Sequence, residues 1–180
     1  MIRNEIHKLE KKLKQIDREK KTQRKSRQGT FKVALVGYTN VGKSSLMNKL
    51  TGADTLVENK LFATLDSTVR KIKKNFPYPV LLSDTVGLIN KLPHDLVASF
   101  KSTLDEVRDA DLLIHVVDIS HPEYKNQMQT TDDLLIQMEM DAIDVVLVFN
   151  KTDSIEDIEE LDRAQENFPS AISISCKKGE

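Results

Sequence analysis

The chain has 180 residues, of which 39% are apolar and 31% are charged, and this composition is typical of a soluble globular protein with one full core. No apolar run reaches the roughly 18 residues of a membrane span, and the charged N-terminus excludes a secretory signal. The single cysteine, Cys176, cannot form an internal disulfide, so we expect a cytoplasmic protein and a small buried thiol.

Charge is divided unevenly along the chain. Residues 1–28 hold 11 Lys and Arg against 4 Asp and Glu, a net charge of +7, whereas residues 29–180 carry −8. Five apolar residues in the first part alternate in spacing by four and three, and they are Ile2, Ile6, Leu9, Leu13 and Ile16. This pattern predicts a basic, coiled-coil-like helix over 1–28 that precedes a separate domain over 29–180.

The seam of this helix has no obvious partner helix within the chain. It pairs with another molecule, packs on the next domain, or marks a fragment that lacks a preceding helix, and we favour the fragment. Its positive charge is either a solvated face or a surface for RNA phosphates.

From residue 31 onward, strand and helix patterns alternate, which predicts an α/β fold with a mostly parallel sheet between two layers of helices. The expected parallel strands lie near 31–36, 79–83, 112–117, 144–149 and 171–175. An antiparallel strand is expected over Val69–Asn75, turned at Phe76–Pro79, and helices near 43–50, 93–108, 122–140 and 156–167. Inside the apolar run 112–117, His115 is expected to be a core histidine with its polar atoms satisfied. No closing helix follows the last strand, so the domain looks shortened at this end.

A glycine-rich loop joins the first strand to the first helix. Gly37 and Gly42 allow the backbone to curl so that several N–H groups point at one anion, and the helix adds its positive dipole end. Lys43 is expected to bridge the outer phosphates of a nucleotide, and the Ser44 hydroxyl to bind Mg²⁺. The loop is therefore a phosphate-binding loop of nucleotide hydrolases. Its predicted contact residues are Gly37, Tyr38, Thr39, Asn40, Val41, Gly42, Lys43, Ser44 and Ser45.

A threonine-bearing segment, 61–68, follows the first helix. A threonine here would complete the coordination of Mg²⁺ only when the terminal phosphate is present, which makes the segment a switch. Thr64 is our choice and Thr68 is its rival. The predicted contact residues of this segment are Phe62, Ala63, Thr64, Leu65 and Asp66.

The second strand end carries Asp84-Thr85-Val86-Gly87, and all four are predicted site residues. A carboxylate at Asp84 can hold Mg²⁺ through its water shell. The Gly87 N–H can approach the terminal phosphate because no side chain stands in the way. At the carboxyl ends of parallel strands, such residues meet at one edge of the sheet.

The motif Asn150-Lys151-Thr152-Asp153 follows the strand that ends at Phe149. Guanine presents two donors on one edge, and the Asp153 carboxylate can accept both, whereas adenine offers an acceptor there. Asp153 therefore selects guanine through polar groups that would be left unpaired with the wrong base. The Lys151 stem can lie over the base, and Asn150 can tie two loops together.

After the last strand come Ser175-Cys176-Lys177. Their backbone N–H groups are placed to meet the guanine carbonyl oxygen.

Together these motifs resemble the GTP-binding domain of the HflX family of translation-associated GTPases. The shared stretches are Gly37–Ser44, Leu61–Asp66, Thr68–Arg70, Asp84–Gly87, Leu92–His94, Ala98–Glu106, Ala110–Asp111 and Asn150–Asp153. The resemblance covers about 29–180, and the basic helix resembles the end of the family's preceding helical region. Leu88 stands where the family usually has phenylalanine, and Ser67 where it usually has proline.

The resemblance implies a three-layer P-loop GTPase domain that binds GTP and GDP with Mg²⁺ and hydrolyses GTP. It also implies binding to the large ribosomal subunit and its RNA, in the rescue or splitting of stalled ribosomes. The predicted metal ligands are Ser44, Thr64 and Asp84, and the predicted catalytic residues are Lys43, Thr64 and Gly87.

Leu88 occupies the position at which many GTPases have a glutamine that orients the attacking water. Leucine cannot hydrogen-bond water, so we expect slow intrinsic hydrolysis that a partner accelerates. Asn40 resembles the asparagine of GTPases that use K⁺ as a charge-stabilising ion, whereas the alternative, which we favour from the sequence, is a loop-stabilising asparagine. Two other functions stay open: a guanine-nucleotide sensor without turnover, and an RNA-binding adaptor that acts through the basic helix.

Overall fold

The computed structural model describes residues 29–52, 68–72, 76–85, 87, 106–155 and 158–179. The chain divides into two compact units, Met1–Thr30 and Phe31–Glu180, and the second is described here. The helix predicted over 1–28 lies outside the described residues. Of the helix predicted over 93–108, only 106–108 are described, and they form a helical turn.

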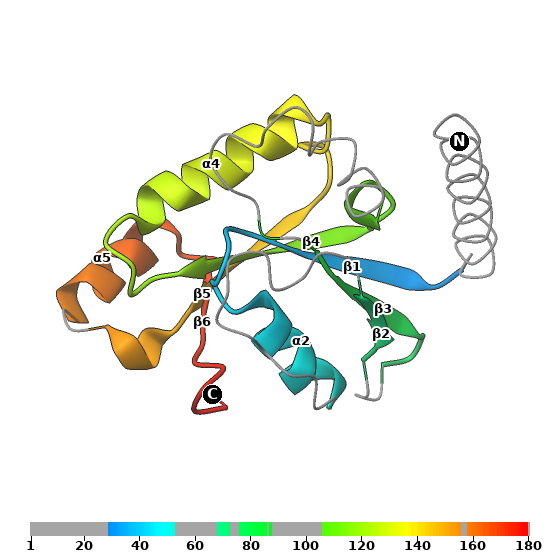
Figure 1. The fold of residues 1–180 in the computed structure, drawn as a ribbon, viewed down its shortest axis with the longest axis horizontal. Helices are drawn as coiled ribbons and strands as arrows, with labels where there is room; N and C mark the ends of the chain where they lie inside the picture. The colour runs from blue at the N-terminus through cyan, green and yellow to red at the C-terminus, as the bar shows by residue number, and fades with distance from the viewer. Residues whose placement is uncertain are drawn as a thin grey trace, which may run out of the picture. The chain divides into compact units, whose positions relative to one another are not determined.

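The described residues of the second unit form one six-stranded sheet with helices on both sides (Figure 1). Its elements are β1 (Phe31–Val36), α2 (Lys43–Thr51), β2 (Thr68–Lys71), β3 (Val80–Asp84), β4 (Leu112–Asp118), α4 (Tyr124–Gln137), β5 (Val145–Asn150), the short 3-10 helix η1 (Thr152–Ser154), α5 (Ile158–Asn167) and β6 (Ile172–Ser173). The strand order is β2-β3-β1-β4-β5-β6. β2 pairs antiparallel with β3 and every other pair is parallel, which confirms the predicted α/β fold.

Alternate residues of the strands point to opposite faces, and each face packs against its own helices. On β1, Val33 and Leu35 join Leu46 and Met47 of α2 in one apolar cluster. Ala34, next to them, belongs to a second cluster with Leu135 of α4. A third cluster joins the ends of β4 and β5 to α4 and α5. Figure 1 shows α2 on one side of the sheet and α4 on the other.

Three elements end earlier than the sequence pattern predicts. β2, expected over Val69–Asn75, ends at Lys71, and the early ends of β6 and α4 each have a local cause. β6 was expected over 171–175 but ends at Ser173, because the next carbonyl, that of Ile174, accepts hydrogen bonds from the N–H and hydroxyl of Thr152. α4 was expected over 122–140 but ends at Gln137, and Glu139 then takes a left-handed conformation with φ of 58°. That conformation stops the helix.

The buried histidine of β4 behaves as expected. His115 is 2% exposed, and its Nδ1 lies 3.3 Å from Oδ1 of Asp132 on α4. The pair therefore connects the middle of the sheet to the helix that covers it.

In the part of the chain that the structure describes, no helix is both long enough and apolar enough to cross a membrane.

Two valines of β5 test how strongly the fold depends on burial. Val148 is 5% exposed and Val145 is 49% exposed. We expect Val148→Ala to lower the free energy of unfolding by about 2 kcal/mol, because it removes two buried methyl groups and leaves a cavity. Val145→Ala should cost about 0.5 kcal/mol or less. Urea unfolding followed by circular dichroism measures both, and equal losses would contradict the described burial of β5.

Candidate nucleotide-binding site

The carboxyl ends of four parallel strands meet at one edge of the sheet. The glycine loop leaves β1 there, and β3, β4 and β5 end at Asp84, Asp118 and Asn150. The register fixes their relative heights: Leu35 of β1 pairs with Asp84, and Asp118 pairs with Asn150. In open α/β sheets this edge is where ligands bind.

Two positions of the phosphate loop admit only glycine. Gly37 has φ of 141° and Gly42 has φ of 99°, and side chains rarely adopt such angles. A Cβ on Gly37 would also stand 2.2 Å from the Val116 carbonyl oxygen, and one on Gly42 would stand 2.2 Å from Nδ2 of Asn150. The loop is therefore curled tightly against β4 and against the end of β5.

Lys43 begins α2 and folds back across this loop. Its Nζ donates to the carbonyl oxygens of Gly37 at 3.0 Å and Tyr38 at 2.7 Å. Burial lowers the pKa of Lys43 to about 8, against an opposing effect of the Asp84 carboxylate, so the amine is mostly charged at neutral pH. A cation is thus held inside the curl of the loop, where an anion would bind.

The two described residues that were predicted as Mg²⁺ ligands are in contact. The Ser44 hydroxyl donates to Oδ2 of Asp84 at 2.5 Å. A hydroxyl and a carboxylate are oxygen ligands of the kind that Mg²⁺ prefers, so the donor set fits this ion. Gly87, beyond Asp84, also lies against the loop, since a Cβ there would come within 2.7 Å of Thr39 Cα.

Part of the predicted site cannot be placed. Thr64 and its neighbours Phe62, Ala63, Leu65 and Asp66 lie outside the described residues, as do Val86 and Leu88. Thr68, the rival of Thr64, lies on β2 opposite Asp84. Across the described ranges there is no group of three or more His, Cys, Asp and Glu side chains that could hold a metal ion by themselves.

Asn150 joins the phosphate loop to the two loops that carry the predicted base contacts. Its Nδ2 donates to the Val41 carbonyl oxygen at 2.8 Å, and its Oδ1 accepts from the Cys176 N–H at 3.1 Å. The side chain is 2% exposed, so both bonds are shielded from water. The expectation that Asn150 ties loops together agrees with this geometry.

The predicted base-reading carboxylate is oriented by the segment that follows β6. Asp153 Oδ1 accepts from the Ser175 hydroxyl at 2.6 Å, and Ser154 donates to Oδ2 at 3.3 Å. The hydrogen bond from Ser175 is the main reason why the pKa of Asp153 is lowered, with a smaller effect from Lys177. The carboxylate therefore stays ionised and able to accept hydrogen bonds.

Cys176, between these residues, is 8% exposed. Burial raises the pKa of its thiol, which agrees with the expected small buried residue.

Asp118 is a site residue that the sequence patterns did not predict. Its Oδ2 lies 2.6 Å from Nζ of Lys151, so it contacts a predicted site residue directly. The available signal was its position, because it ends an apolar strand as Asp84 does. The position of Asp118 does not indicate which residue it contacts, because Lys151 is 33 residues away along the chain.

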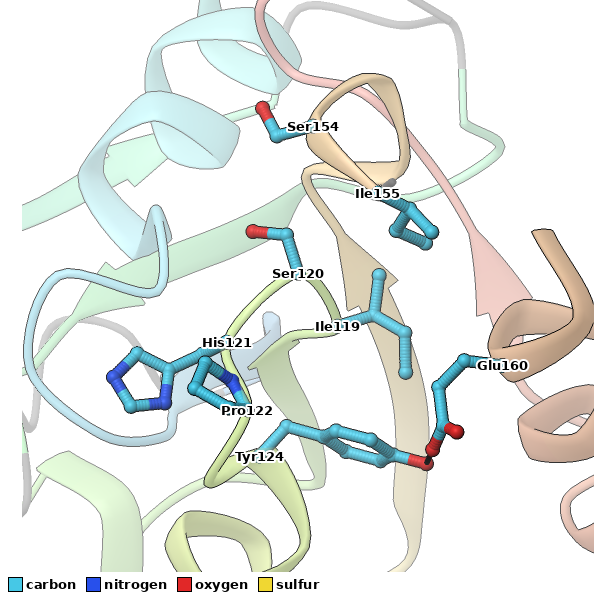
Figure 2. Close-up of a pocket in the computed structure, with 8 residues that line it drawn as sticks. All are labelled: Ile119, Ser120, His121, Pro122, Tyr124, Ser154, Ile155 and Glu160. Atoms are coloured by element: carbon cyan, nitrogen blue, oxygen red, sulfur yellow. Dashed lines mark hydrogen bonds between the residues drawn. The ribbon is translucent and has the colours of Figure 1, made fainter. Parts of the chain in front are cut away.

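A separate cavity of about 550 Å³ lies between the segment that follows β4 and the segment that carries Ser154 and Ile155 (Figure 2). Its lining residues are Ile119, Ser120, His121, Pro122, Tyr124, Ser154, Ile155 and Glu160. Tyr124 donates a hydrogen bond of 2.9 Å to Glu160, which joins α4 to α5 across one side of the cavity. None of the predicted site residues lines it.

The parallel sheet, the curled glycine loop and the loops that Asn150 ties together define the class of protein as a P-loop GTPase domain. Residues 32–151 match the family described as "50S ribosome-binding GTPase", and the chain belongs to this family.

The relatives of this chain identify its family more precisely. The chain is 54% identical over 155 residues to GTPase HflX of Flavobacterium psychrophilum, which covers 86% of this chain and 37% of that protein. It is 46% identical over 182 residues to GTPase HflX of Magnetococcus marinus, covering 100% of this chain and 42% of that protein. These relatives confirm the predicted HflX family, and the chain spans about two fifths of their length.

A solved structure supports the fold. A GTP-binding protein of the archaeon Sulfolobus solfataricus, in complex with GDP, matches with a TM-score of 0.66 at 29% identity. The match covers 98% of this chain and 53% of that one.

Two asparagines that donate to backbone carbonyls test the bridge at the site. Asn150→Ala should lower the free energy of unfolding of the nucleotide-free protein by about 2–3 kcal/mol, because it leaves a buried N–H and a buried carbonyl unpaired. Asn167 on α5 donates to the Arg163 carbonyl at 2.8 Å but is exposed. Asn167→Ala should therefore cost about 0.5 kcal/mol, as measured by urea unfolding. A loss for Asn150→Ala no larger than for this control would contradict the bridge.

Proposed function

We propose that this chain binds GTP and GDP together with Mg²⁺ and hydrolyses GTP slowly until a partner accelerates the reaction. The observation that carries the proposal is the convergence on Asn150. A single buried side chain holds the phosphate loop at Val41 and the base loop at Cys176 in one fixed arrangement. A ligand that fits both loops has phosphates at one end and a base at the other.

Recognition of guanine rests on Asp153 in this proposal. The Ser175 hydroxyl occupies one lone pair of Oδ1 and the Ser154 hydroxyl one of Oδ2, so the carboxylate keeps about two lone pairs for two further donors. Guanine supplies two adjacent donors and adenine does not. The carboxylate is ionised at neutral pH, and the lowered pKa of Asp153 extends this state to more acidic pH.

The phosphates would lie in the curl of the loop, next to Lys43. The amine now donates to two loop carbonyls, and a phosphate group would offer it a stronger, charged acceptor. Ser44 and Asp84 would hold Mg²⁺, with Thr64 as the further ligand proposed from the sequence. The ion would neutralise charge on the outer phosphates.

The partner that we propose is the large ribosomal subunit with its RNA. The family description, 50S ribosome-binding GTPase, and the HflX relatives support this choice. The action proposed with it is the rescue or splitting of stalled ribosomes.

Titration calorimetry with GTP, GDP and ATP in Mg²⁺ buffer tests the nucleotide. We expect binding of GTP and GDP, and binding of ATP weaker by at least about 10³-fold. In Asp153→Asn, one acceptor becomes a donor, so preference should move from guanosine to xanthosine nucleotides. Lys43→Ala should lose tight binding of either. Undiminished GTP affinity in Asp153→Asn would contradict the proposed base recognition.

Single-turnover hydrolysis tests the catalytic part. Asn40 is exposed in the phosphate loop with φ of 61°, and we propose that its carbonyl oxygen coordinates K⁺ beside the phosphates. Hydrolysis should be faster in K⁺ than in Na⁺ at equal ionic strength, and Asn40→Ala should remove the difference. Equal rates in the two salts would contradict the role of Asn40.

The same single-turnover assay tests the proposed partner. Addition of 50S subunits should raise the rate of GTP hydrolysis. No turnover with or without the subunits would favour a nucleotide sensor instead.

A further inference from the structure

The ammonium group of Lys151 is held by a carboxylate from the neighbouring strand. Lys151 Nζ lies 2.6 Å from Oδ2 of Asp118, the last residue of β4. The side chain of Asp118 is 10% exposed and that of Lys151 is 30% exposed, so the pair is only partly open to water. A charge-assisted hydrogen bond in such surroundings is stronger than an ion pair on an open surface.

Asp118 is itself fixed in place. Its other oxygen, Oδ1, accepts from the Ser120 hydroxyl at 2.6 Å and from the Ser120 N–H at 3.2 Å. The backbone next to it is paired with β5, since Ile119 N–H donates to the Asn150 carbonyl oxygen at 3.1 Å. The carboxylate therefore has one orientation, set by the β4–β5 register and by Ser120.

Lys151 has a flexible stem that this carboxylate restrains. A lysine side chain loses much of its rotamer entropy when it is fixed in one conformation. The backbone of Lys151 is also fixed, at a left-handed φ of 65°, and its carbonyl accepts from the Ser154 N–H at 2.9 Å. With both ends held, the stem between them has little freedom before any ligand arrives.

We propose that Asp118, secured by Ser120, is a positioning residue that holds Lys151 ready to cover the face of the purine base. The inference rests on the proposed binding of guanine nucleotides. In this proposal, Asp118 contributes to the affinity for the nucleotide and Asp153 to the selectivity for guanine. Asp153 reads the base edge, where guanine and hypoxanthine differ, whereas Asp118 acts through Lys151 on the face that all purines share.

Substitution of the two carboxylates is therefore expected to change different quantities: the rate of nucleotide dissociation for Asp118, and the preference between bases for Asp153. Asp118→Asn removes the charge that holds Lys151 and keeps the shape of the side chain. We expect a fluorescent GDP, carrying an N-methylanthraniloyl group, to dissociate about tenfold faster from this variant. The ratio of the dissociation constants for inosine diphosphate and GDP should stay at its wild-type value, whereas Asp153→Asn should change this ratio.

Three further variants isolate the contact. Lys151→Met keeps an apolar stem without the ammonium group, and in this background Asp118→Asn should have no additional effect on dissociation. Ser120→Ala should give a smaller acceleration, about threefold, because one hydrogen bond to the carboxylate is lost. Glu159→Gln is the matched control. It removes one negative charge from an exposed pair with Arg163 on α5 and should leave dissociation unchanged.

Stopped-flow fluorescence measures dissociation, and thermal unfolding of each variant confirms that it is folded. A wild-type rate in folded Asp118→Asn would overturn the inference and leave the proposed function intact. Effects of Asp118→Asn and Lys151→Met that multiply in the double variant would overturn it too. If Asp118→Asn does not fold, Ser120→Ala decides, and a wild-type rate there overturns the inference. Failure of the wild-type protein to bind GDP would instead contradict the proposed function.

Discussion

The site depends on one buried amide. Asn150 uses both ends of its side chain, Nδ2 toward Val41 and Oδ1 toward Cys176, and neither bond competes with water. The close approach of Gly42, where a Cβ would stand 2.2 Å from Nδ2, is a second consequence of the same contact. The glycine is needed because the amide is there, and the amide is there because β5 ends at that height in the sheet. The conformation of the phosphate loop therefore depends on the register of the sheet.

The sheet supplies this constraint through its strand order. β1 lies between β3 and β4, so the loop that leaves β1 is flanked by Asp84 on one side and Asp118 on the other. Apolar side chains on both faces fix the strands relative to one another. The polar residues of the site lie at the ends of the strands. Packing therefore sets where the polar groups stand, and the polar groups then hold each other through hydrogen bonds that cross between loops.

Much of this arrangement is predictable from the sequence because it depends on patterns of neighbouring residues. The glycine spacing of residues 37–44 and the apolar runs before Asp84 and Asn150 are patterns within a few residues. What the sequence does not show is the competition between elements. β6 is short because Ile174 bonds Thr152 instead of extending the ladder, and α4 ends early because Glu139 turns left-handed. The pairing of Asp118 with Lys151 needs the β4–β5 register, which no local pattern contains.

The bond between Asn150 and Val41 spans 109 residues, and that between Asn150 and Cys176 spans 26. Contacts so distant in sequence form late in folding, because long loops must close before the contacts stabilise anything. During synthesis, the phosphate loop of a growing chain is made long before its anchor, Asn150, and Asn150 itself lacks its second partner until residue 176 has emerged. The arrangement on which the proposed nucleotide binding rests is therefore complete only after both partners of Asn150 have been synthesised.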